Sequence, residues 1–141
     1  MLQMTRRTTT ILVIDDEPSA INDVAQALRV TDYTCQWATS AETAIDYVRR
    51  GPPDLIISDI DLGFTSGLEL YQQLRDCPGA AEVPVIFISG AQIPDIVRRA
   101  HTAGGVYFLR KPFDPGVLVE LVEKSLWMPH LLRRQLMPAL N

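Results

Sequence analysis

Short apolar runs alternate along this chain with longer segments in which apolar residues recur at helical spacing. Continuous runs rich in Ile, Leu and Val occupy residues 11–14, 55–57, 83–88 and 106–109. Runs of this length are typical of parallel strands that are buried on both faces. A half-polar run at 34–38 has the composition expected of a strand at a sheet edge. The pattern therefore predicts five strands.

Helix-start signals separate these strands. The predicted helices begin near Pro18, Thr39, Ser66, Pro94 and Asp114. Thr39 and Ser66 each stand three residues before a glutamate, which is the spacing of a capping box, and proline is favoured in a first helical turn. The apolar residues expected to face the core from the last helix are Val117, Leu118, Leu121 and Val122.

Five strands that alternate with five helices through short connections predict an α/β fold: a doubly wound parallel sheet with helices on both faces. Right-handed crossovers place the carboxyl ends of the strands at one edge. In such sheets ligands bind outside that edge, near the point where the strand order reverses. A functional site should therefore be built from residues that directly follow the apolar runs.

Length and composition indicate a single soluble domain. We expect it over residues 10–127, with a flexible, Thr-rich lead-in at 1–9 and a short apolar tail at 128–141. The net charge of −4 argues against nucleic-acid binding, because phosphate contacts need a surplus of Lys and Arg. No apolar run approaches the ~18 residues of a membrane span, so we expect no membrane contact and a cytoplasmic location. Cys35 and Cys77 fit neither a metal spacing nor a disulfide framework and are expected to be buried.

Polar side chains follow four of the predicted strands. Asp15 and Asp16 come after the first strand, Asp59 after the third, Ser89 after the fourth and Lys111 after the fifth. Like charges raise one another's pKa unless a cation compensates them, and Mg²⁺ prefers such oxygen ligands. The set suits phosphoryl transfer, in which catalysis is chiefly positioning and electrostatic stabilisation.

In type, order and spacing these residues resemble the receiver domain of bacterial two-component response regulators, over roughly residues 10–126. The resemblance implies a flavodoxin-like (βα)5 fold, similar to chemotaxis regulators, with strand order 2-1-3-4-5. It implies a signalling domain rather than an enzyme, which accepts a phosphoryl group from a histidine kinase or a phosphotransfer protein. The output stays open, since a stand-alone regulator and a receiver within a longer protein both fit.

The resemblance also assigns roles at the site. Asp59 is the expected phosphoacceptor, and Lys111 is the lysine of the site. Ser89, where the family more often has threonine, is expected to hydrogen-bond the phosphoryl group. Ser89 and Phe108 take the two positions of the family's conformational switch.

The metal site implied by the resemblance holds Mg²⁺ and no other cofactor. Its ligands are expected to be Asp15, Asp16, Asp59 and the backbone carbonyl of Asp61. Many receivers carry proline where this chain has Gly63, and we expect the loop to be more mobile for that reason.

Three other interpretations fit parts of the pattern. Haloacid-dehalogenase-type phosphotransferases also use an Asp-x-Asp motif like Asp59 and Asp61, but their acidic metal pair follows the lysine, whereas Asp15 and Asp16 precede Asp59. A flavodoxin-like cofactor binder needs a Gly-, Ser- or Thr-rich loop after the first strand, where the acids of this chain would repel phosphate. A pseudo-receiver that no longer uses phosphate would not need the full polar set.

Residues 128–141 carry more apolar side chains than a solvated tail needs. Pro129 is expected to end the preceding helix, after which Leu131, Leu132 and Leu136 recur at helical spacing. Because a lone helix of this length is marginal in water, the tail is expected to pack on something. Packing on a second copy, which gives a homodimer, or on another partner is favoured; packing on its own last helix stays open.

Overall fold

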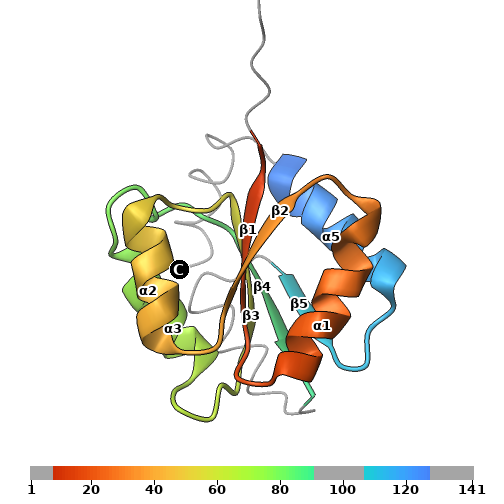
Figure 1. Cartoon of the computed structure of the whole chain (residues 1–141), viewed down its shortest axis with the longest axis horizontal. Coiled ribbons are helices and arrows are strands. Elements are labelled where there is room, and N and C mark those ends of the chain that lie inside the picture. The colour runs from red at the N-terminus through yellow and green to blue at the C-terminus, as the bar shows by residue number, and fades with distance from the viewer. Residues whose placement is uncertain (1–7, 91–106, 128–141) are drawn as a thin grey trace, which may run out of the picture.

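The computed structural model describes residues 8–90 and 107–127, which form a five-stranded parallel sheet with helices on both faces (Figure 1). The strands are β1 (Thr10–Ile14), β2 (Thr34–Ala38), β3 (Leu55–Asp59), β4 (Val85–Ser89) and β5 (Tyr107–Arg110). Their order is β2-β1-β3-β4-β5, which confirms the predicted fold and strand order and places the half-polar β2 at an edge. The helix expected from Pro94 and the tail 128–141 lie outside the described residues, as does most of the lead-in.

The described helices are α1 (Pro18–Ala27), the 3₁₀ turn η1 (Leu28–Val30), α2 (Ala41–Arg50), α3 (Gly67–Arg75) and α5 (Pro115–Trp127). Figure 1 shows α1 and α5 on one face of the sheet and α2 and α3 on the other. Among these helices, none combines the length and apolar character that crossing a membrane requires.

Alternation of side chains along the strands builds one apolar layer on each face. In β1, Leu12 and Ile14 belong to the layer under α2 and α3, which we call the α2–α3 layer. Ile11 and Val13 belong to the layer under α1 and α5, the α1–α5 layer. Strands buried on both faces need apolar residues at every position, which is why the runs in the sequence are continuous.

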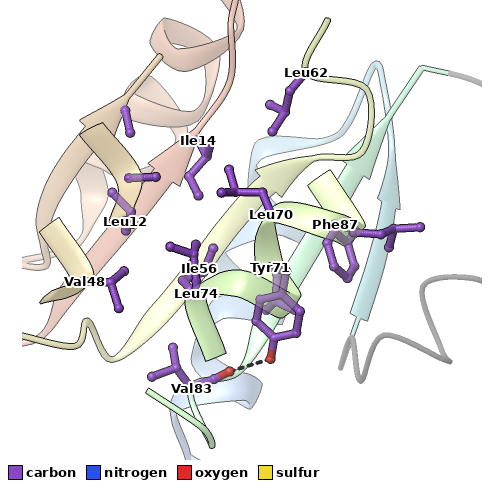
Figure 2. Packing of buried hydrophobic residues seen from close by; sticks show 14 of the residues in the cluster. Leu12, Ile14, Val48, Ile56, Leu62, Leu70, Tyr71, Leu74, Val83 and Phe87 are labelled. Carbon is purple, nitrogen blue, oxygen red and sulfur yellow. Dashed lines mark hydrogen bonds between the residues drawn. The ribbon is translucent and has the colours of Figure 1, made fainter. Parts of the chain in front are cut away.

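The α2–α3 layer is held partly by an aromatic pair (Figure 2). The rings of Tyr71 on α3 and Phe87 on β4 meet edge to face, with centroids 5.7 Å apart and planes at 90°. The buried Tyr71 hydroxyl donates to the carbonyl oxygen of Val83 at 2.7 Å. This hydrogen bond lets a large aromatic side chain be buried without leaving its polar atom unpaired, and it ties α3 to the segment that leads into β4.

The helix starts agree with the predicted caps except at α2. There Ser40, not Thr39, is the N-cap, and its hydroxyl accepts from the backbone N–H of Thr43 at 3.2 Å. Ser66 is the N-cap of α3 as predicted, but its hydroxyl accepts from the N–H of Leu68 at 3.1 Å and not from that of Glu69, as a capping box requires. The Glu69 carboxylate instead accepts from the hydroxyl of Thr65 at 3.3 Å. The carboxylate of Asp114 accepts from the N–H of Gly116 at 2.7 Å at the start of α5.

Two expectations about burial were wrong. Val117 is 42% exposed, because the stripe of α5 that faces the sheet is centred on Leu118, Val122 and Ser125 and leaves Val117 at its margin. Cys35 and Cys77 are free thiols, as expected, but both are only partly buried.

Candidate functional site

The carboxyl ends of β1, β3, β4 and β5 bring the predicted polar residues to one rim of the sheet. Asp15 directly follows β1, and its backbone N–H donates to the carbonyl of Ala38 at the end of β2, at 3.1 Å. Asp59 ends β3 and lies opposite Ile88 of β4 in the parallel register. Ser89 ends β4 and lies opposite the last residue of β5. The expectation that these strand ends meet at one edge is therefore confirmed.

Lys111 connects the two halves of this rim. Its ammonium lies 2.7 Å from Oδ2 of Asp59 and 3.2 Å from Oδ2 of Asp15. Its backbone N–H donates to the carbonyl of Ser89 at 2.8 Å, which extends the β4–β5 ladder by one step and fixes where the side chain departs. The peptide bond from Lys111 to Pro112 is cis.

The ion pairs lie at the boundary of the solvent. The side chains of Asp15, Asp59 and Lys111 are 8%, 11% and 29% exposed. Burial raises the pKa of Asp15, and the nearby charge of Asp59 acts in the same direction, whereas Lys111 and the N–H of Glu17 lower it less strongly. Burial alone would lower the pKa of Lys111, but its hydrogen bonds and charge contacts with Asp59 and Asp15 outweigh burial and raise it. The charged form of Asp15 is thus disfavoured where it sits, chiefly because the carboxylate is buried.

The loop after β3 is shaped around Asp16. Gly63 has φ +77°, and a Cβ atom built on it would lie 2.8 Å from Oδ2 of Asp16. Oδ1 of Asp59 accepts from the N–H of Asp61 at 3.0 Å, and Oδ1 of Asp61 accepts from the N–H of Gly63 at 3.1 Å. Proline cannot adopt a positive φ, so the proline found here in many receivers would require a different loop. The sequence pointed to the glycine, but its closeness to Asp16 depends on tertiary structure.

The two expected switch residues lie on adjacent strands. Ser89 is 2% exposed at the end of β4. Phe108 lies opposite Phe87 across the β4–β5 ladder and packs, partly buried, against the α2–α3 layer. Tyr107 packs against the α1–α5 layer, because successive side chains along a strand point to opposite faces of the sheet.

The chemistry of the donor set fits Mg²⁺. Asp15, Asp16 and Asp59 supply hard carboxylate oxygens at one rim, and Gly63 leaves beside Asp16 the space that a Cβ would fill. Within residues 8–90 and 107–127, no three acidic, His or Cys side chains are arranged to hold a metal by themselves. Mg²⁺ does not need such an arrangement, because it usually binds through one or two carboxylates and keeps several waters.

Comparison with known proteins decides the family. The model of the response regulator receiver domain matches residues 11–123. This chain is a response regulator receiver domain. Response regulator Rre1 of Synechocystis sp. is 32% identical over 117 residues, which are 82% of this chain and 51% of that protein. The phosphate regulon regulator PhoB of Pseudomonas aeruginosa is 32% identical over 110 residues, which are 78% of this chain and 48% of that protein.

Solved structures agree with the family assignment. The crystal structure of a response regulator from Thermotoga maritima superimposes with a TM-score of 0.77 at 27% identity, covering 86% of this chain and 100% of that one. The chemotaxis protein CheY4 of Vibrio cholerae gives a TM-score of 0.79 at 22% identity, covering 84% and 99%, and shows the shared fold. The receiver chain spans about half the length of the curated relatives named above.

Proposed function

We propose that this receiver domain accepts a phosphoryl group on the carboxylate of Asp59 from the phosphohistidine of a sensor kinase or a phosphotransfer protein. The observation that supports the proposal most directly is the contact of Lys111 Nζ with Asp59 Oδ2, at 2.7 Å, beside the buried Asp15. A pseudo-receiver has no use for an acidic residue buried at this cost, whereas phosphoryl transfer needs both the acids and the ammonium.

In the proposed reaction an oxygen of Asp59 attacks the phosphorus while the bond from phosphorus to the donor imidazole nitrogen breaks. Lys111 holds one carboxylate oxygen and places its positive charge where the phosphoryl oxygens arrive. The N–H of Asp61 donates to the other oxygen and orients the carboxylate. Ser89 ends the adjacent strand, one residue beyond the partner of Asp59, and would hydrogen-bond the transferred group.

Mg²⁺ would be held by Asp15, Asp16, Asp59 and the backbone carbonyl of Asp61. When bound, the cation would offset the negative charge that the acids and the phosphoryl oxygens bring together. The residues of the chain prepare that position: Asp15 is held by the N–H of Glu17 and by Lys111, and Gly63 leaves Asp16 unobstructed.

The proposed output is a change of surface. A hydrogen bond from the Ser89 hydroxyl to the phosphoryl group would draw Ser89 toward Asp59, and the ring of Phe108 would turn into the space it leaves. The phosphoryl charge would then bias a two-state element on the β5 side of the sheet. A downstream protein or a fused output domain would read this changed surface.

Phosphorylation with acetyl phosphate and MgCl₂, followed by intact mass measurement, tests the proposal. The chain should gain one phosphoryl group, and Asp59→Asn should gain none. Asp16→Asn should need at least about tenfold more Mg²⁺ to reach the same degree of phosphorylation, the loss expected when a group is removed from a metal site. Asp46→Asn, an exposed carboxylate on α2, is the matched control and should behave like the parent chain.

Labelling that persists in Asp59→Asn, or in excess EDTA, would contradict the site assignment. Absence of labelling in a folded parent chain, with both acetyl phosphate and a panel of phosphorylated histidine donors, would favour the pseudo-receiver. Aromatic NMR signals of Phe108 with and without a phosphoryl mimic test the switch separately, and an unchanged ring would count against it.

A further inference from the structure

A groove lies at the end of the sheet where the strands begin, opposite the rim that carries Asp15, Asp16 and Asp59. It consists of two adjoining cavities of about 500 and 620 Å³ that share Tyr33 and Glu123. One side is the part of α5 from Val119 to Trp127, and the other is the stretch 30–33 before β2, with Thr9 before β1 at the end. Figure 1 shows this end of α5 next to the start of β1. We call this feature the α5 groove.

The α5 groove is flanked by large apolar side chains that face the solvent. Val30 is 83% exposed and Trp127 is 81% exposed. Leu126 and Val119 also line the groove and are partly buried. Single exposed apolar residues are ordinary, but several beside one groove usually mark an interaction surface.

The rim of the groove is acidic. Asp32 and Glu123 are both exposed, and both act on the Tyr33 hydroxyl, whose pKa is raised first by burial and then by these two charges. The basic residue of the lining, Lys124, is paired with Glu120 at 3.6 Å, which offsets its charge. An occupant should therefore offer apolar side chains together with positive charge.

The segment that follows Trp127 in the sequence has this composition. Residues 128–141 contain Arg133 and Arg134 and no Asp or Glu, with Leu132 and Leu136 one helical turn apart. The groove begins at Trp127 itself, so only a short loop has to close, and the entropic cost is small. The groove follows α5 from Trp127 back to Val119, about 12 Å of helix, which is the length of a helix of eight residues.

We propose that residues 129–137 fold back antiparallel to α5 and occupy the α5 groove of the same chain. In this arrangement Leu132 and Leu136 contact the apolar lining next to Trp127, and the two arginines lie at the rim formed by Asp32 and Glu123. Docking supplies the packing that a helix of this length needs, since it would be marginal alone in water. This differs from the expectation of a second copy, because the groove lies where the tail starts and carries the complementary charge.

Two rival occupants give different results. A second copy would bring its own tail or its own Trp127, and the contact would then depend on protein concentration. The lead-in also reaches the groove, beside Thr9, and carries Arg6 and Arg7, but its only aliphatic side chains are Met1, Leu2 and Met4. It offers no pair of leucines at helical spacing.

Trp127 reports on the groove directly. In the full chain carrying Trp37→Phe, it is the sole tryptophan, and acrylamide quenching of its fluorescence measures its exposure. Docking predicts that Leu132→Ser with Leu136→Ser increases the quenching constant about twofold and shifts emission to the red, since indole burial covers a large area. Leu140→Ser, beyond Pro138 and outside the docked stretch, is the matched control and should change neither. Asp32→Asn with Glu123→Gln should give a smaller increase, and added salt should mimic it.

Each other result overturns the proposal. Equal quenching in the parent chain and the Leu132 and Leu136 variant would show that the tail does not cover the groove. An increase caused by Leu2→Ser with Met4→Ser, and not by the tail variant, would assign the groove to the lead-in. Quenching that falls as the protein is concentrated, with a dimer mass in sedimentation, would assign it to a second copy.

Discussion

Lys111 lies 2.7 Å from Asp59, so the ammonium occupies the space beside the carboxylate that phosphorylation is proposed to modify. It also contacts Asp15 at 3.2 Å, and without it two partly buried carboxylates would face each other unshielded. The same ion pair that prepares the site for a phosphoryl group therefore also stabilises the fold.

Lys111→Met should lower the free energy of unfolding in EDTA by about 1–3 kcal/mol, because the carboxylates of Asp15 and Asp59 lose their hydrogen-bonded cation. Millimolar MgCl₂ should restore part of the loss, since a cation that binds the folded state stabilises it. Urea unfolding measures both effects. Lys124→Met, which removes an exposed partner of Glu120, should change stability by less than about 0.5 kcal/mol. Equal effects of the two substitutions would refute the special role of Lys111.

Asp15→Asn should raise the stability of the metal-free chain at neutral pH. A carboxyl whose pKa is raised by folding contributes stability while protonated, below its unfolded pKa, and loses it as the pH rises through the folded pKa. At pH 7 the charge of Asp15 therefore costs stability, and asparagine removes that charge while keeping an oxygen for the N–H of Glu17. Chemical unfolding in EDTA at pH 7 should show the gain, and Asp23→Asn on the exposed side of α1 should not. A less stable Asp15→Asn chain would contradict this interpretation.

Gly63→Ala should destabilise the chain by about 1–2 kcal/mol, because a positive φ is costly for any residue with a Cβ. It should also weaken Mg²⁺ binding, since the new Cβ would press on Oδ2 of Asp16. Gly79→Ala is the matched control: its φ of +80° is nearly the same, but its Cβ would meet Pro52 instead. Calorimetric titration with MgCl₂ should separate the two variants, and similar affinities in both would rule out the steric link to Asp16.

Burial raises the pKa of the Cys35 thiol, so less of it is thiolate at a given pH. In Cys77→Ser, alkylation of Cys35 by iodoacetamide at pH 8 should be at least about threefold slower in the folded chain than in urea, because the thiolate is the nucleophile. The rate in the folded chain should continue to rise at pH values above the pKa of an ordinary thiol, about 8.5, because the pKa of Cys35 is raised. Mass spectrometry follows the reaction, and identical rate profiles with and without urea would disprove the shift.

The sequence contained enough to predict the five strands and the rim at which they end, because strands buried on both faces require continuous apolar runs. It did not decide which of two neighbouring residues caps a helix, or which apolar residues of a helix face the sheet. Thr39 and Ser40 both carry a hydroxyl, and only the backbone geometry shows that Ser40 caps α2. Val117 matched the helical spacing of α5, yet its place relative to the sheet leaves it at the margin. The contacts of Lys111 and the clearance at Gly63 are tertiary and have no local pattern.

β5 carries side chains into both apolar layers: Phe108 into the α2–α3 layer, and Tyr107 and Leu109 into the α1–α5 layer. A turn of the Phe108 ring would thus disturb the face of the sheet that lies away from the α5 groove. Sites that share no packing partners normally contribute additively to stability. Phosphorylation and tail docking should then be separable inputs, so a double-mutant cycle between Phe108→Ala and Leu136→Ser should give a coupling energy near zero. The two faces of the sheet would then respond to phosphorylation and to tail docking independently of each other.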